Sequence, residues 1–342
     1  MANKLPLFPI LQDTLLSPLA RRAAEAPLDS TGCLTEYRPL ESRSILSRTT
    51  SRRGLPFSYG INPYRGCEFA CRYCYARYTH EFLELKDPQE FERKIYFKQN
   101  AHWLLTQELR QLKPDTLIAL GTATDPYQPL ERRQRVTRSI LQAFAETSGL
   151  ALGIVTKSTL IVRDIDLLRT IAERHRLTVH LTVTTTNTAL ARILEPRAPR
   201  PDLRLRALTQ LRRAGLRAGV LCSPLMPGIT DTHASIDAVA RAAAAADACF
   251  FAAGALFLKP CSKPTFLDFV RRHFPQLVPA YEQRYATHAF VSNAYKKRIA
   301  DMVESIRRTH KLGYRYSDPQ GYVMASKTAD ALQEQPWLPF SG

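Results

Sequence analysis

Three cysteines stand close together in the first quarter of the chain, with the spacing Cys67-x3-Cys71-x2-Cys74. Three thiolates on one short loop can bind three irons of a [4Fe–4S] cluster, which leaves the fourth iron free for a reacting ligand. Zinc is the alternative, but a structural zinc site has four ligands, and the fourth would be His80, at a spacing unusual for zinc. Packing of the thiols in the core is disfavoured because charged residues interrupt the run. The loop favours an iron–sulfur cluster with an open coordination site.

The elements that position this loop follow a regular pattern. From about residue 55, short apolar runs rich in β-branched residues alternate with amphipathic stretches. The apolar runs predict strands at 57–62, 116–121, 152–156, 179–184, 218–222 and 249–258. The amphipathic stretches predict helices at 101–112, 134–147, 165–174, 203–214 and 234–246. This alternation is typical of an α/β fold with a parallel sheet, either a partial barrel or an open doubly wound sheet, with functional residues at the carboxyl ends of its strands.

The flanking segments differ from this central region. Residues 1–54 are rich in Pro, Ser and Arg and show no long apolar period, which predicts an N-terminal arm of mostly loop with a helix near 15–24. After 260 the strand pattern stops, and helical patterns at 266–273, 277–285 and 294–310 predict a C-terminal helical cap and tail over 261–342. The expected organisation is therefore an arm, a barrel over 55–260 and a cap.

The cysteine loop after the first strand of a β/α domain resembles the radical S-adenosylmethionine superfamily. Tyr73 stands directly before the last cysteine, where that superfamily usually has an aromatic residue near the adenine. The resemblance implies a partial (β/α)6 barrel, a [4Fe–4S] cluster held by Cys67, Cys71 and Cys74, and S-adenosylmethionine bound to the free iron. It also implies reductive cleavage of this cofactor to a 5′-deoxyadenosyl radical, which abstracts hydrogen from the substrate.

A narrower resemblance covers most of 55–260. The blocks GTATDPYQPLERR, VTKS, TVTTT, LEPRAPRPDLR and AGVLCSPLMPGITD follow one another as in the spore photoproduct lyase-like branch, whose members are labelled DNA repair photolyases. The resemblance implies cofactor contacts by Thr124 and Asp125 after the second strand, Lys157 after the third, and Thr182 and Thr184 at the end of the fourth. Each of these residues also has a non-functional alternative. Asp125 could simply start a turn, Thr182 and Thr184 could simply favour a strand, and Lys157 could be a solvated side chain at a strand end.

One feature of the lyase does not carry over. Its two tyrosines match Tyr73 and Tyr75, which makes both candidates for a catalytic role. Its hydrogen-donating cysteine, just before the Asp of the second-strand motif, has no counterpart, because the matching stretch GTAT contains no thiol. Cys222 in the fifth strand and Cys261 just past the sixth are candidate catalytic thiols, although a free buried cysteine more often packs as a small hydrophobe.

The composition bears on partners. The 342 residues include 48 Lys plus Arg against 31 Asp plus Glu, a net charge of +17. Such an excess favours an acidic partner, DNA or RNA above all, unless it reflects an arginine-rich proteome. Basic residues gather at 132–138, 192–217 and 296–298, either as a phosphate-binding surface near the barrel mouth or as solvated helix faces.

These patterns favour a radical S-adenosylmethionine enzyme acting on a nucleic acid or nucleotide, with a flavodoxin- or ferredoxin-type electron donor. Two alternatives stay open: the same chemistry on a peptide or small metabolite, and a non-catalytic metal- or cluster-containing protein that binds nucleic acid. The longest apolar window is too short to span a bilayer, which needs about 20 residues, and the N-terminus lacks the pattern of a secretory signal. We therefore expect a cytoplasmic protein without membrane contact.

Overall fold

The central sheet contains six parallel strands in the computed structural model, which describes residues 16–32, 34–49 and 57–315. The strands are β4 (Tyr59–Ile61), β7 (Leu117–Leu120), β8 (Ala151–Thr156), β9 (Arg176–Thr182), β10 (Ala218–Leu225) and β11 (Phe251–Ala255). They pair in that order, and β3 (Leu46–Arg48) adds antiparallel to β4. The partial barrel predicted from the sequence is confirmed, with shifts of a few residues at strand ends.

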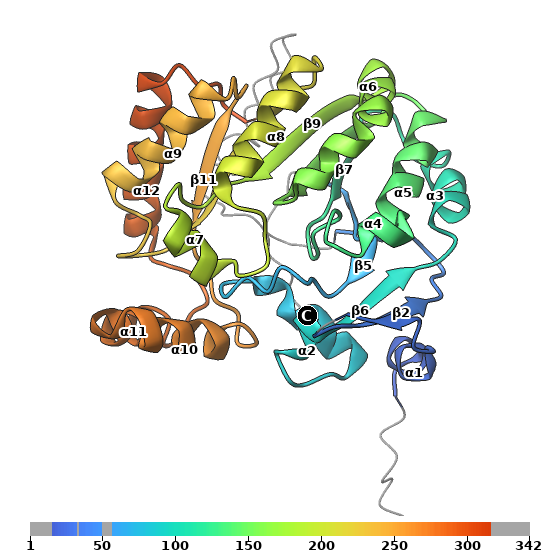
Figure 1. Ribbon diagram of the computed structural model, residues 1–342, viewed down its shortest axis with the longest axis horizontal. Helices are drawn as coiled ribbons and strands as arrows, with labels where there is room; N and C mark the ends of the chain where they lie inside the picture. The colour runs from blue at the N-terminus through green and yellow to red at the C-terminus, as the bar shows by residue number, and fades with distance from the viewer. Residues whose placement is uncertain (1–15, 33, 50–56, 316–342) are drawn as a thin grey trace, which may run out of the picture.

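Helices cover the outer face of this sheet (Figure 1). They are α3 (Ala101–Leu109), α4 (Glu131–Gln134), α5 (Val136–Ala145), η2 (Thr159–Asp164), α6 (Ile165–Arg174), α7 (Thr188–Leu194), α8 (Pro201–Arg213) and α9 (His233–Ala245). Local chemistry marks their starts, since the side chain of Asn187 accepts from Leu190 N and that of Thr232 from Ser235 N. Proline opens α8, where its missing N–H costs nothing.

The core lies between the sheet and these helices. Strand residues Val179, Leu181 and Val220 are fully buried, as are helix residues Ile140 and Leu208, and all five belong to one apolar cluster. Each such side chain contributes about 1.5–3 kcal/mol by leaving water. This packing fixes the strand ends, where the polar side chains of interest stand.

The N-terminal segment is more structured than a loop arm. It forms α1 (Pro18–Glu25), β1 (Ser30–Thr31) and β2 (Glu36–Leu40), and it also supplies β3. The strands of a second sheet pair in the order β1-β2-β6-β5. Along the chain, β5 (Tyr64–Arg65) is followed by η1 (Tyr75–Leu83), α2 (Glu90–Arg93) and β6 (Lys94–Lys98). The helix expected near 15–24 is confirmed by α1, whereas the strands were not predicted because segments of two to five residues are too short to show a period.

Four helical segments follow the last strand: α10 (Lys263–His273), η3 (Pro275–Leu277), α11 (Val278–Arg284) and α12 (Asn293–Thr309). In Figure 1, α12 lies beside β11 and α9, and α10 and α11 lie together below them. Among the helices of the described residues, none combines the length and the apolar character that a bilayer span requires.

Candidate functional site

The three clustered cysteines lie on a loop between β5 and η1. Gly66 opens this loop with a φ of +84°, and a Cβ there would lie 2.8 Å from the carbonyl oxygens of Lys94 and Phe91. Only glycine fits such a close backbone approach. The N–H of Cys67 donates to Phe91 O at 2.9 Å, and that of Cys74 donates to Cys71 O at 3.1 Å. The Cys loop is therefore held against α2 and β6.

The segment after β7 holds the same loop from the other side. The hydroxyl of Thr124 donates to Gly66 O at 2.6 Å, and Gln128 Nε2 donates to the same oxygen at 3.2 Å. Gln128 Oε1 in turn accepts the N–H of Glu68 at 3.0 Å. Sequence reasoning missed Gln128, although it lies inside the GTATDPYQPLERR block. It is fully buried, and its amide spans the two segments.

Residues from the Cys loop and from five strand ends line one cavity of about 980 Å³, including its open mouth. Its Cys-loop side comprises Cys67, Phe69, Cys71, Tyr73, Cys74 and Tyr75. The ends of β7, β8 and β9 contribute polar residues, among them Thr124, Asp125, Thr156, Lys157 and Thr182. The ends of β10 and β11 contribute Ser223, Pro224, Gly254, Ala255, Leu256 and Phe257, among others. The lining combines thiols, a few polar side chains and apolar surface, which suits a small cofactor together with part of a substrate.

Asp125 is a buried carboxylate with every oxygen engaged. Its Oδ1 accepts the Thr156 hydroxyl at 2.6 Å and the Tyr127 N–H at 2.9 Å, while Oδ2 accepts the Lys157 N–H at 2.7 Å. Burial raises the pKa of Asp125, and these hydrogen bonds and the Lys157 charge lower it. The turn expected at this residue is present, since Oδ1 bonds the N–H two residues on, and the carboxylate also faces the cavity.

A buried ion pair stands behind the Cys loop. Arg204 Nη2 lies 2.5 Å from Glu195 Oε2, and both side chains are at most 1% exposed. The other carboxylate oxygen of Glu195 accepts the phenol of Tyr73 and, at 3.3 Å, the hydroxyl of Thr184. Arg204 Nη1 donates to Thr182 O at 3.0 Å. The pair thus links the Cys loop to the end of β9.

The donor set fits an iron–sulfur cluster. Burial raises the pKa of all three thiols, that of Cys71 to about 12, so the thiolate form needs a nearby cationic group. Among the described residues, no three Cys, His, Asp or Glu side chains converge closely enough to hold one ion. Each thiolate of a cubane binds a different iron, so its sulfurs lie farther apart than the ligands of zinc. His80, the suggested zinc ligand, bonds Lys94 O through Nε2 instead.

Three candidate residues lie outside the cavity lining. Thr184 is two residues past β9 and bonds Glu195. Cys222 is fully buried in the core, because successive strand side chains alternate and its neighbours Leu221 and Ser223 face the cavity. Cys261 is half-buried, and its sulfur lies 3.5 Å from the hydroxyl of Ser262, which donates to Cys74 O. Cys33 lies outside the described residues. Neither Cys222 nor Cys261 is among the residues that line the cavity.

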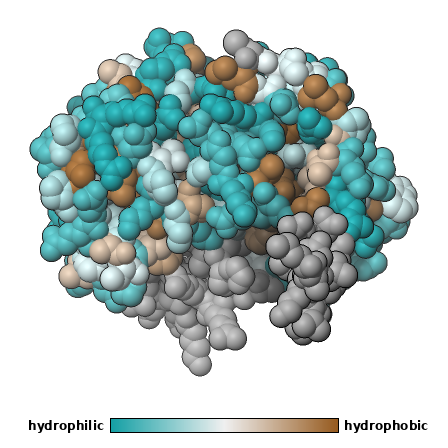
Figure 2. Space-filling model, turned by 90° about the horizontal axis from the view of Figure 1, so that it is seen from below, coloured by the Kyte–Doolittle hydropathy of each residue, from teal (hydrophilic) through white to brown (hydrophobic). Residues whose placement is uncertain are grey.

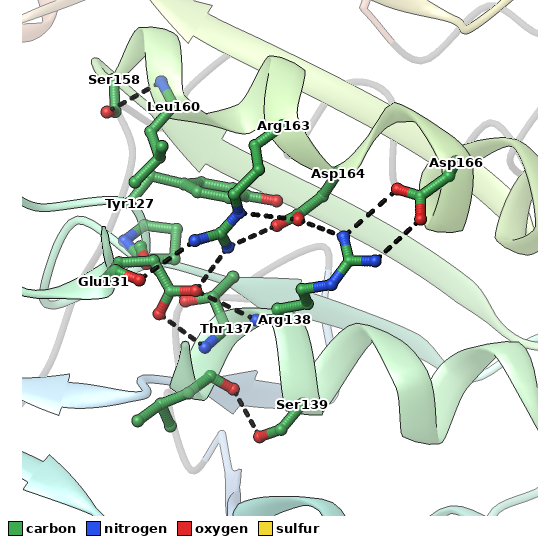
Figure 3. A network of polar contacts seen from close by, with 12 residues as sticks. Tyr127, Glu131, Thr137, Arg138, Ser139, Ser158, Leu160, Arg163, Asp164 and Asp166 are labelled. Atoms are coloured by element: carbon green, nitrogen blue, oxygen red, sulfur yellow. Dashed lines mark hydrogen bonds and ion pairs between the residues drawn. The ribbon is translucent and has the colours of Figure 1, made fainter. Parts of the chain in front are cut away.

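Figure 3 shows how the loops after β7 and β8 are fixed to each other. Arg163 Nη2 reaches Glu131 Oε1 at 2.7 Å and Asp164 Oδ2 at 2.8 Å. Arg138 bridges Asp164 at 2.6 Å and Asp166 at 2.8 Å. Both Glu131 and Asp164 are fully buried. The network fixes the segment that carries Asp125 relative to the segment that carries Lys157. Because Arg138 is bound to two aspartates, it is not a free cation of the expected phosphate-binding surface.

Residues 61–238 match the family model described as the Radical SAM superfamily. An uncharacterised protein of Mycobacterium tuberculosis is 34% identical over 272 residues, 79% of each chain. An uncharacterised protein of Methanocaldococcus jannaschii is 26% identical over 254 residues, 73% of this chain and 86% of that protein.

Solved structures show a similar fold. Spore photoproduct lyase complexed with dinucleoside spore photoproduct superimposes with a TM-score of 0.57 at 15% identity, covering 80% of this chain and 79% of that one. A mutant of that lyase with bound AdoMet and dinucleoside spore photoproduct gives a TM-score of 0.55 at 15% identity, covering 79% and 78%.

Proposed function

The chain belongs to the radical SAM superfamily, and from that premise we propose that this enzyme removes a hydrogen atom from a nucleic acid or nucleotide. The superfamily uses a [4Fe–4S] cluster and S-adenosylmethionine, which supply reductive cleavage of the cofactor and a 5′-deoxyadenosyl radical. One observation carries the assignment of the site: the three loop thiols and the polar ends of β7, β8 and β9 line the same cavity.

Each wall of the cavity has its own task in this proposal. Cys67, Cys71 and Cys74 hold the cluster. Asp125 and Lys157 provide opposite charges for the amino and carboxylate groups of the cofactor, and they stand at adjacent strand ends joined by a 2.7 Å hydrogen bond. The charges are buried, so their interactions with a zwitterionic ligand are stronger than in water.

The substrate would meet the wall made by β10 and β11. Most of its side chains are small or apolar, including Ala255, Leu256 and Phe257, which excludes water from the reacting atoms. The buried hydroxyl of Ser223 has no hydrogen-bond partner among the described residues, so it is available to orient the substrate. The reacting atoms would lie inside the cavity beside the Cys loop, so a base within a duplex would have to leave the stack to react.

Two observations favour a nucleic acid over a peptide or metabolite. The net charge of +17 suits a polyanion, and a structure of the same fold was solved with a dinucleoside. Tyr73 and Tyr75 both line the cavity, and we propose that they take part in hydrogen transfer in place of a thiol, because no cysteine other than the three ligands is among its lining residues.

Isotope transfer tests this proposal. Reconstituted protein is incubated without oxygen with a chemical reductant, S-adenosylmethionine and either a deuterated single-stranded oligonucleotide or a deuterated peptide mixture. We expect deuterium in 5′-deoxyadenosine from the oligonucleotide, and no cofactor cleavage by the Cys71→Ala variant. Deuterium from the peptides alone would contradict the nucleic-acid substrate while keeping the radical chemistry.

A further inference from the structure

The Cys loop has a second side, which faces away from the cavity. Cys67, Phe69 and Cys71 line the cavity, whereas Arg72 does not. The N–H of Arg72 donates to Leu194 O at 2.9 Å. The outer side of the loop is therefore packed directly against the end of α7.

Four arginines surround this outer side. Arg72 lies on the loop, Arg93 at the end of α2, Arg192 on α7 and Arg197 in the linker after α7, and we call them the arginine rim. The Arg197 N–H donates to Phe69 O at 3.4 Å, and its Nη1 donates to the carbonyl of Glu92, next to Arg93. Arg192 donates to Pro196 O, beside Arg197. These contacts bring together the backbone segments that carry the four arginines, and the side chains of Arg93 and Arg192 are exposed.

The charge of the rim is balanced only in part, since the charge of Arg197 acts on the buried Glu68 carboxylate. The side chains of Arg72 and Arg93 have no hydrogen-bond or ion-pair partner among the described residues, and those of Arg192 and Arg197 bond only carbonyl oxygens. The carboxylate of Glu92 is committed to Arg77 at 2.9 Å. Other arginines flagged in the sequence are used differently, since Arg138 binds two aspartates, Arg204 a glutamate and Arg212 an aspartate.

The face at the bottom of Figure 1, where α2 lies, is seen from below in Figure 2. Its visible described residues are mostly hydrophilic, with hydrophobic side chains in scattered spots. A partner that docks on such a surface is held by charge rather than by a large apolar interface, as in weak and transient redox encounters.

We propose that the arginine rim docks an acidic one-electron carrier protein that reduces the cluster. This inference rests on the proposed function, which consumes one electron for each cofactor cleaved. The carrier loses that electron and the cluster gains it, without a bond forming or breaking between the proteins. Cofactor and substrate occupy the cavity side of the Cys loop, so an electron reaches the cluster over the shortest distance from the outer side of the loop. Arg72 is directly bonded to Cys71 in the chain, which brings the docked carrier close to a cluster ligand.

Reduced flavodoxin, an acidic flavoprotein, is the probe, and titanium(III) citrate is the small-molecule reductant. The test variant is Arg93→Gln/Arg192→Gln, which leaves the Cys loop untouched. The matched control is Arg213→Gln/Arg241→Gln, which removes two exposed arginines from α8 and α9. Deoxyadenosine formation is measured with each reductant, and binding of oxidised flavodoxin is measured separately by titration calorimetry at low and high salt.

We expect the test variant to lose about tenfold in the flavodoxin-supported rate and in flavodoxin affinity at low salt, and to match wild type with titanium citrate. The control variant should keep both. Equal losses in the two variants, or none in either, would overturn the docking surface. Loss of affinity for a single-stranded oligonucleotide in place of flavodoxin would assign the rim to nucleic acid. If wild type forms no deoxyadenosine even with titanium citrate, the proposed function fails, and the binding titration still decides the surface.

Discussion

The carboxylate of Asp125 and the backbone of Lys157 join two neighbouring strand ends through a 2.7 Å hydrogen bond. Lys157 Nζ also lies 5.7 Å from the ring centre of Tyr73 on the Cys loop. The segments after β7 and β8 and the cluster-binding loop therefore meet at one point. A cofactor that touches any of them is positioned by all three.

Replacing Asp125 with Asn should separate cofactor binding from cluster assembly. The amide keeps the size of the carboxylate but removes its charge and one acceptor, so we expect S-adenosylmethionine to bind about 10- to 100-fold more weakly. Iron and sulfide contents should stay at wild-type levels. Asp115→Asn, at an exposed aspartate, is the control. Unchanged cofactor affinity in Asp125→Asn would remove this residue from the site.

The Glu195–Arg204 pair should be a large contributor to stability when only one partner is removed. Glu195→Gln leaves the Arg204 charge buried and unpaired, which costs about 3–5 kcal/mol of unfolding free energy. The double variant Glu195→Gln/Arg204→Met should regain much of this loss. The exposed pair partner Asp202 offers a control, since Asp202→Asn should leave the denaturant midpoint nearly unchanged. Equal midpoints for Glu195→Gln and Asp202→Asn would contradict the role of the pair.

Gly121, at the end of β7, should tolerate no side chain. Its φ is +88°, and a Cβ would lie 2.6 Å from Val155 O and from Pro126 Cδ. Gly149 has a similar φ of +80° but open space around it, so Gly149→Ala isolates the backbone cost of about 1 kcal/mol. We expect Gly121→Ala to lose about 1–3 kcal/mol more than Gly149→Ala in urea unfolding. Equal losses would show that the strand ends yield to relieve the clash.

The sequence predicted the strands because buried parallel strands carry dense apolar runs, and Asp125 and Lys157, singled out by the family resemblance, follow strand ends that can be read from those runs. It could not predict the Glu195–Arg204 pair, since nothing local tells which of many nearby arginines turns inward. Cys222 was a candidate because the sequence predicted its strand but did not show which face of the sheet its side chain lies on. A shift of one residue exchanges the core face for the cavity face.

Lys98 should make stability depend on pH in the alkaline range. Burial and the nearby charge of Arg65 lower its pKa from 10.5 to about 8 in the folded protein. Between these values the unfolded chain binds more protons than the folded one, so the free energy of unfolding rises with pH. This lysine by itself contributes a rise of about 2 kcal/mol from about pH 8 to about pH 10, against an opposing fall from buried thiols such as Cys71.

Urea midpoints across this range check the prediction. Lys98→Met should remove the rising contribution, so that its stability relative to wild type falls by about 2 kcal/mol between pH 8 and pH 10, because the methionine side chain does not titrate. Lys113→Met, at an exposed lysine, should retain that contribution. An unchanged pH dependence in Lys98→Met would assign the effect to another group.

The most direct test of the account is electron paramagnetic resonance of the protein, reconstituted with iron and sulfide under anaerobic conditions and reduced with dithionite. Spectra are recorded with and without S-adenosylmethionine, and 5′-deoxyadenosine is assayed in the same samples. The account predicts a [4Fe–4S]⁺ signal that changes when the cofactor is added, together with formation of deoxyadenosine. Absence of a cluster, or a cluster signal that the cofactor leaves unchanged, would contradict it.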